Sequence, residues 1–80
     1  MILRNDELDN RIRDADARYG PFASTHEAMG VALEEWRELG NAVWDNNLDA
    51  VREEALDLAA VCIRLAESLE NQSTRDRSVK

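Results

Sequence analysis

Two pairs of acidic residues have the spacing that brings carboxylates together on a helix. Glu35 and Glu38 are three residues apart, and so are Glu54 and Asp57. On an α-helix, residues three apart lie about 60° apart around the axis and share one face. Each pair can therefore direct two oxygen ligands toward one point.

Both pairs fall on the apolar side of their expected helices. In a helical projection Glu35 lies between Val31 and Leu39, and Glu54 lies beside Leu58. An ionised carboxylate that faces a core without a partner costs on the order of several kcal/mol, and four of them also repel one another. A divalent cation relieves both costs, and hard oxygen ligands suit Mg²⁺ or Mn²⁺. We therefore expect the two pairs to form one metal site.

Three neighbouring residues are further candidates for this site. Glu34 projects beside the first pair, where it is a fifth ligand, an outer residue that supports the ligands, or a solvated side chain. Glu53 projects near Asp57 and has the same alternatives. Arg64 also projects near Asp57, where it either contacts a substrate phosphate or forms a salt bridge to one of the same acids.

Composition excludes several classes of function. The 80 residues form one domain with a formal net charge of −7, which argues against a nucleic-acid partner and fits a protein that binds cations. With one histidine, no Ser-His-Asp set is available, and the Glu-x-x-His motif of di-iron bundles is absent. We see no apolar run of transmembrane length and no signal peptide, so we expect a cytoplasmic protein without a membrane partner.

Three helices are expected to position the acids. Asn5 is a candidate N-cap for the first helix, which carries a narrow apolar stripe and ends at the Gly-Pro pair 20–21. Ser24 and Glu27 form a capping box that begins a second helix, which runs to about Asp45. Asparagines at 46–47 then make a short turn, so the second and third helices should pack antiparallel and bring the acidic pairs face to face.

The third helix is expected to run from about Leu48 to Glu70. Its middle, residues 55–66, is apolar almost all the way round, and we expect its Cys62 to be buried. Two other helices cannot surround such a helix. The sequence therefore predicts an all-α, three-helix chain over residues 1–70 whose bundle is completed by homo-oligomerisation, followed by a disordered polar tail over 71–80.

The two acidic motifs resemble those of a known superfamily. Residues 34–38 read Glu-Glu-Trp-Arg-Glu, and after fifteen residues 54–57 read Glu-Ala-Leu-Asp. This pattern is similar to the Glu-Glu-x-x-Glu and Glu-x-x-Asp motifs of the MazG-like all-α nucleoside triphosphate pyrophosphohydrolases. Residues 19–27 also resemble small MazG-like proteins of phages and bacteria, and the resemblance spans roughly residues 19–70.

The resemblance implies Mg²⁺-dependent hydrolysis of a nucleotide to its monophosphate and pyrophosphate by a dimer or tetramer. It implies Glu35, Glu38, Glu54 and Asp57 as the metal ligands. The attacking group should then be water, with Glu35 or Glu38 as the carboxylate that accepts its proton.

Two departures from the superfamily pattern bear on these expectations. Its members usually have four or more helices per chain, so either a second subunit supplies the missing surface or the chain is a non-catalytic oligomeric interaction module that keeps the fold. Lys80 is the only lysine, so phosphate contacts should come from arginines such as Arg37, Arg52 or Arg64.

Overall fold

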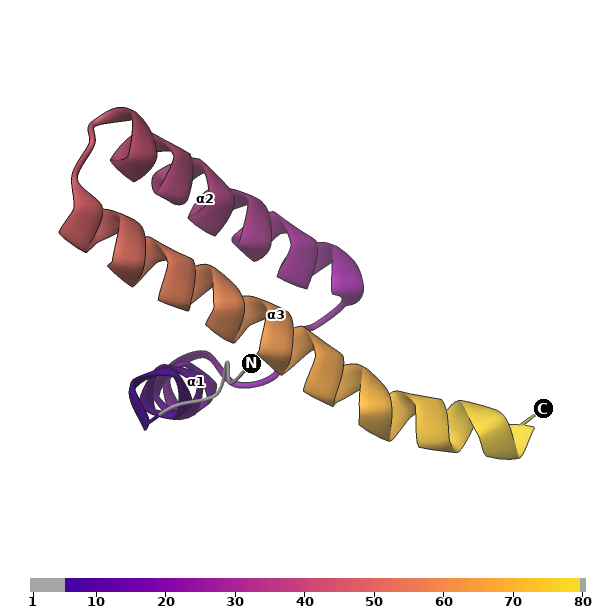
Figure 1. The fold of residues 1–80 in the computed structure, drawn as a ribbon. Helices are drawn as coiled ribbons and strands as arrows, with labels where there is room; N and C mark the ends of the chain where they lie inside the picture. The colour runs from indigo at the N-terminus through magenta and orange to yellow at the C-terminus, as the bar shows by residue number, and fades with distance from the viewer. Residues whose placement is uncertain (1–5, 80) are drawn as a thin grey trace.

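Three helices make up the fold of this chain. The computed structural model describes residues 6–79, and it describes side chains for residues 6–70. The helices are α1 (Asp6–Tyr19), α2 (Thr25–Trp44) and α3 (Leu48–Val79), and residues 6–79 contain no strand (Figure 1). The all-α fold class is confirmed, as are the starts of the second and third helices to within one residue.

The helix α3 is the element on which the other two pack. Figure 1 shows α2 running antiparallel along the first half of α3, while α1, seen nearly end-on, lies against α3 on another side. Leu8 and Ile12 of α1 are buried against Ala60 of α3. Three half-buried side chains of α3 pack around this cluster: Leu56, Ala59 and Ile63. The apolar stripe of α1 thus fixes that helix to the middle of α3.

The link between α1 and α2 follows the predicted end and cap. Gly20 adopts a φ of 70° and its N–H donates to the carbonyl of Asp16 at 2.9 Å, which closes α1. The Oγ of Ser24 accepts from the N–H of Glu27 at 3.1 Å, as a capping box requires. The Glu27 carboxylate in turn accepts from Ala23 at 2.6 Å, one residue before the cap.

The turn between α2 and α3 is built from the two asparagines. Asn46 has a φ of 58°, the left-handed conformation that asparagine tolerates, and its N–H donates to the carbonyl of Val43 at 3.0 Å. The Oδ1 of Asn47 accepts from the N–H of Ala50 at 3.2 Å and so caps α3. This short connection forces the antiparallel hairpin that the sequence predicted.

The helix α3 differs from its expectation in two respects. Cys62 is exposed, so the prediction that it is buried is wrong. Among the described helices, α1 and α2 pack on α3 and leave the face with Cys62 uncovered. The helix continues to Val79, past its predicted end near Glu70. The predicted disordered tail lies outside the residues whose side chains are described and stays a prediction. No helix in the described part of the chain has the length and apolar character needed to cross a bilayer.

The glycines give a first test of the fold. Gly20→Ala should lower the free energy of unfolding by about 1 kcal/mol, because alanine disfavours a positive φ. Gly30→Ala, the matched control within α2, should instead raise it by about 0.5–1 kcal/mol, because the added Cβ meets nothing within 4 Å. Urea unfolding followed by circular dichroism measures both. Equal effects of the two substitutions would contradict the turn geometry.

Candidate metal centre

The register of the α2–α3 hairpin brings the two acidic pairs together. Glu38 and Glu54 lie eight residues to either side of Asn46, and Glu35 and Asp57 lie eleven to either side. Helices rise by the same amount per residue, so residues equally far from a tight antiparallel turn end up at the same height. The two pairs therefore face each other across the hairpin.

Three of the four acids converge on one point. Glu35, Glu38 and Glu54 each offer a carboxylate oxygen, and these oxygens all lie within 4.8 Å of one another. Ligand oxygens about 2.1 Å from a Mg²⁺ ion are separated by roughly 3–4 Å, so small side-chain movements would complete a site. We call Glu35, Glu38 and Glu54 the carboxylate triad.

Glu35 lies in the most strained electrostatic environment of the triad. Burial, followed by the charges of Glu38, Asp57 and Glu54, raises the pKa of the Glu35 carboxyl to about 7. Its Oε2 is buried and has no hydrogen-bond partner among the described residues. A buried oxygen without a donor is costly, and a bound cation would satisfy it.

The ionised form of Glu54 is disfavoured for similar reasons. Its pKa is raised, first by burial and then by the charges of Glu38 and Asp57, while Arg11 acts in the opposite direction. The donor set consists of hard oxygens with excess negative charge, which fits Mg²⁺ or Mn²⁺.

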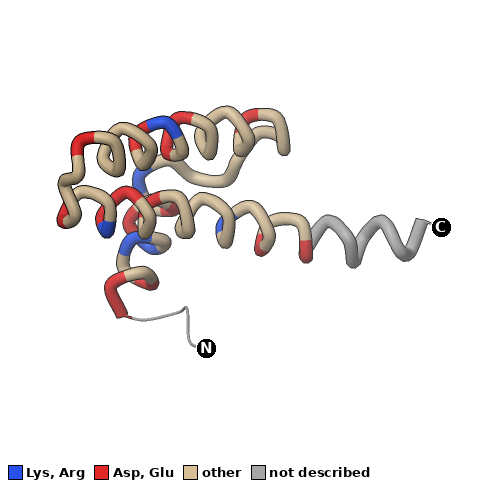
Figure 2. Tube along the Cα trace, turned by 45° about the horizontal axis from the view of Figure 1, so that its top comes forward, with Lys and Arg blue, Asp and Glu red and all other residues tan. Residues whose placement is uncertain are grey.

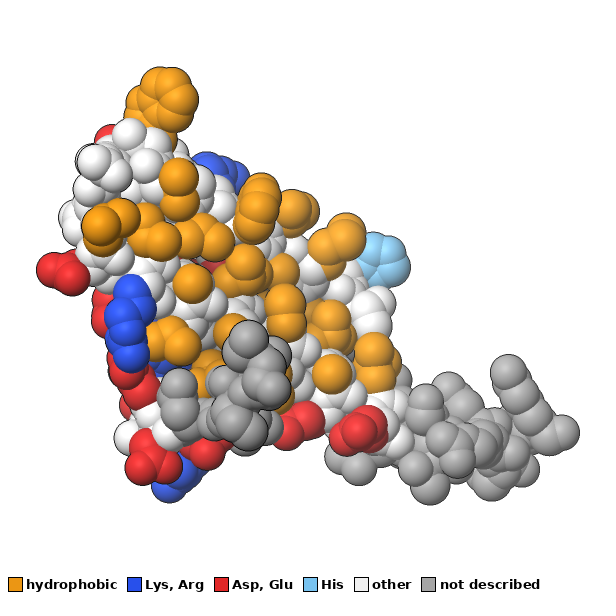
Figure 3. Space-filling view, viewed as in Figure 1, with side chains coloured by type: hydrophobic (Ala, Val, Ile, Leu, Met, Phe, Trp, Pro, Cys, Tyr) orange, Lys and Arg blue, Asp and Glu red, His pale blue; other side chains and the backbone are white. Residues whose placement is uncertain are grey.

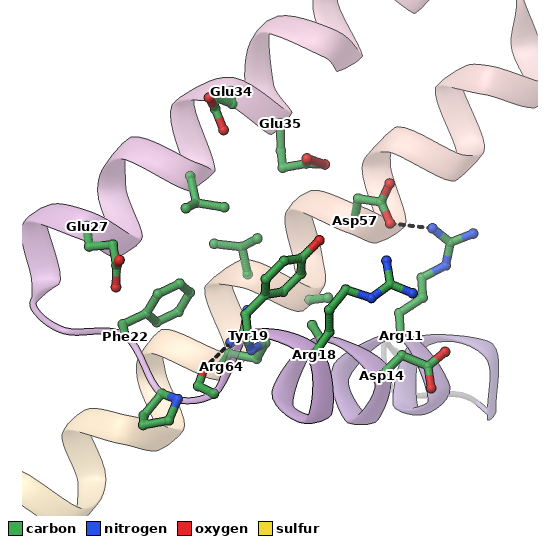
Figure 4. Close-up of a pocket in the computed structure, with 16 residues that line it drawn as sticks. Arg11, Asp14, Arg18, Tyr19, Phe22, Glu27, Glu34, Glu35, Asp57 and Arg64 are labelled. Atoms are coloured by element: carbon green, nitrogen blue, oxygen red, sulfur yellow. Dashed lines mark hydrogen bonds and ion pairs between the residues drawn. The ribbon is translucent and has the colours of Figure 1, made fainter.

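Asp57, the fourth predicted ligand, lies outside the triad because it binds an arginine. Arg11 of α1 donates from Nη1 to the Asp57 Oδ1 at 2.5 Å, as the dashed line in Figure 4 shows. The same nitrogen donates to the Glu53 carbonyl at 3.2 Å, and Nη2 forms an ion pair with the Glu53 carboxylate. Glu53 is therefore an ion-pair partner rather than a member of the triad.

A second arginine extends this network toward the N-terminus. The Nη1 and Nη2 of Arg52 donate to the two carboxylate oxygens of Glu7 at 2.8 and 2.7 Å. This hydrogen bonding holds the pKa of Glu7 below its ordinary value. Figure 2 shows the acidic and basic segments crowded where α1 meets the first half of α3. Arg52 thus joins α3 to α1, away from the triad.

Arg64 connects the end of α1 to α3. Its side chain is buried, its Nε donates to the Asp16 Oδ1 at 2.8 Å, and its Nη2 donates to the Gly20 carbonyl at 2.8 Å. The guanidinium also lies 4.5 Å from the centre of the Phe22 ring. The salt bridge of Arg64 is therefore made with an acid of α1, and not with one of the acidic pairs, which was one of the two alternatives for this residue.

A cavity of about 620 Å³ opens beside Glu35, between α1, the α1–α2 link, α2 and α3. Figure 4 shows its lining, which includes Glu34 and Glu35 of α2 and Asp57 of α3. Four side chains of α1 and the link also line it, across from these acids: Arg11, Arg18, Tyr19 and Phe22. The cavity thus combines carboxylates, guanidiniums and aromatic rings.

The contribution of Arg11 and Arg18 of α1 to this site was not predicted from the sequence. One feature of the sequence could have indicated the role of Arg11. Arg11 directly precedes Ile12 and follows Leu8 by three residues, so it borders the stripe that packs on α3. A long cationic side chain at such a border can reach acids on the neighbouring helix.

Comparison with known proteins gives no assignment: the chain matches no protein-family model, no curated protein and no solved structure. The similarity of its two acidic motifs to the MazG-like superfamily therefore stays a resemblance.

The raised pKa of Glu35 predicts a pH-dependent stability in EDTA. The folded protein holds a proton that an unfolded carboxyl releases near its ordinary pKa of 4.5. The stability from this proton is complete below that pH and is lost as the pH rises through about 7.

The free energy of unfolding of the wild-type protein should therefore fall by on the order of 1 kcal/mol between about pH 5 and about pH 8, and that of Glu35→Gln should fall clearly less. The matched control is Glu34→Gln, which removes the exposed neighbouring acid and should behave as wild type. Thermal unfolding at the two pH values measures all three proteins. A Glu35→Gln profile parallel to that of wild type would show that Glu35 is an ordinary solvated acid.

Proposed function

We propose that the protein is a Mg²⁺-dependent nucleotide pyrophosphohydrolase that converts a nucleoside triphosphate to its monophosphate and pyrophosphate. The observation that best supports this is the convergence of the carboxylate triad beside a cavity. At about 620 Å³, the cavity has the size of a small-molecule site. The resemblance to the MazG-like superfamily, and not the geometry, supplies the position of cleavage.

The triad is the proposed holder of the cation. Glu35, Glu38 and Glu54 would each contribute a carboxylate oxygen, and the unpartnered Oε2 of Glu35 would gain a partner. When bound, the cation supplies positive charge for the phosphate oxygens of the substrate. A chain with a net charge of −7 needs such a charge before a polyphosphate can approach its acids.

The remaining tasks fall to side chains around the cavity. Water is the proposed nucleophile, and a carboxylate of Glu35 or Glu38 accepts its proton. Arg64 lines the same cavity, but its Nε and Nη2 already bind Asp16 and Gly20, so we assign the phosphate contact to Arg18 instead.

We also propose that the enzyme is a cytoplasmic homo-oligomer, most simply a dimer. Four large apolar side chains recur at helical spacing along α2 and are each more than half exposed: Met29, Leu33, Trp36 and Val43. Figure 3 shows apolar side chains gathered over α2 and α3 on one face of the molecule. A contiguous apolar face on so short a chain is typical of an interface between subunits.

This apolar face also supports the alternative function, a non-catalytic oligomeric interaction module. In that case the fold would be retained for its surface, and the triad would bind no substrate. Turnover of a nucleotide distinguishes the two proposals.

The reaction predicts pyrophosphate release from at least one member of a panel of nucleoside triphosphates with Mg²⁺. Glu38→Gln should lower kcat/KM by about 100-fold or more, because it removes a cation ligand. Asp49→Asn, an exposed acid in the first turn of α3, is the control and should leave the rate unchanged. Separate assays detect pyrophosphate and orthophosphate. Release of orthophosphate alone would refute the cleavage position, and no turnover would favour the interaction module.

The oligomer predicts a mass at least twice the 9.1 kDa of one chain in light scattering at micromolar concentration. Trp36→Glu should shift this mass toward the monomer, because it puts a charge into the apolar face. Arg37→Gln, on the neighbouring exposed position, makes the same change of one unit in net charge and controls for that change alone. A well-folded wild-type monomer would exclude this assembly.

A further inference from the structure

Arg11 of α1 reaches into the space between the acidic residues of α3. We propose that Arg11 takes the place of a second divalent cation beside Asp57, so that each chain binds one cation, at the carboxylate triad. This inference rests on the proposed metal centre and concerns the number of ions that it holds. It makes Arg11 a positioning residue, which acts through Asp57.

The contacts of Arg11 are those of a cation held by several oxygens. Its guanidinium binds Asp57 Oδ1, the carbonyl and carboxylate of Glu53 and, at 3.5 Å, the Glu7 Oε2. Its side chain is only 22% exposed, against 57% for Arg52 in the same network. Less solvent surrounds Arg11, so its ion pairs are screened less than those of Arg52.

Of the four predicted ligands, one is paired with an arginine and three converge, which supports a single bound ion per chain. Four facing carboxylates are a donor set of the kind that holds two divalent cations, which lie about 3.5–4 Å apart in two-metal sites. Here Arg11 neutralises Asp57, and the remaining three carboxylates converge within 4.8 Å. A second cation at Asp57 would have to displace the guanidinium and would then repel it, because the packing of Leu8 and Ile12 holds α1 in place.

A guanidinium differs from a metal ion in what it can do at this position. It neutralises Asp57 and fixes the direction of its carboxylate through hydrogen bonds, but it offers no vacant coordination position to a water or a phosphate. Asp57 is thereby held at the wall of the cavity, which Arg11 also lines. The chain would have one positive charge at this position, where a second divalent ion would bring two, and no ligand exchange there.

Counting bound Mn²⁺ tests this inference. In a titration followed by the electron paramagnetic resonance signal of free Mn²⁺, wild-type protein should bind one ion per chain. Arg11→Met keeps the unbranched apolar stem, removes the charge and takes away the ion pair of Asp57, so it should bind two. Arg52→Met, the matched control, removes the arginine that contacts Glu53 but not Asp57 and should still bind one. Circular dichroism shows whether each variant keeps its helices.

Two further variants keep the test decisive if Arg11→Met does not fold. Asp57→Asn should bind one ion with a dissociation constant within about threefold of wild type, whereas Glu54→Gln should bind it at least about tenfold more weakly. Two ions per wild-type chain, or loss of the ion in Asp57→Asn, would overturn the inference and leave the metal centre standing. No bound ion in wild type would instead overturn the metal centre itself.

Discussion

Mutual repulsion of carboxylates across the α2–α3 hairpin is the constraint that governs this structure. The turn at Asn46 places the acidic pairs at matching heights, and the packing of α2 on α3 prevents them from separating. Burial, together with this repulsion, raises the pKa values of Glu35 and Glu54, since a proton relieves part of both costs. A cation would relieve it more completely, which links the stability of the hairpin to the proposed chemistry.

The helix α1 balances this charge and builds the substrate side of the site. Its apolar stripe gives it a fixed position on α3, and that position allows Arg11 to reach Asp57. At the C-terminal end of α1, Arg64 of α3 donates to the Gly20 carbonyl and lies over the ring of Phe22 in the α1–α2 link. One short helix therefore neutralises part of the acidic cluster and also forms a wall of the cavity.

The sequence predicted those features that depend on local geometry. The helix starts and the capping residues follow from side chains that bond to their own backbone, and the facing of the acidic pairs follows from a short turn of known position. The ion pair between Arg11 and Asp57 was not predicted, because helical spacing alone cannot show which charge a long arginine side chain will reach. Cys62 was expected to be buried because periodicity identifies an apolar face but not whether a helix of the same chain covers it. Tertiary packing decides which acceptors Arg11 and Arg64 reach, and the pattern of residues in a single sequence does not reveal that packing.

The proposed chemistry requires that Glu35, Glu38 and Glu54 together hold a divalent cation. Anomalous diffraction from crystals grown with Mn²⁺ is the sharpest test, because the signal locates the ion independently of the protein atoms. We predict one peak per chain between these three carboxylates, within about 2.0–2.3 Å of an oxygen from each. A map with no peak there, or with its strongest peak at other acids of the chain, would contradict the proposed metal centre.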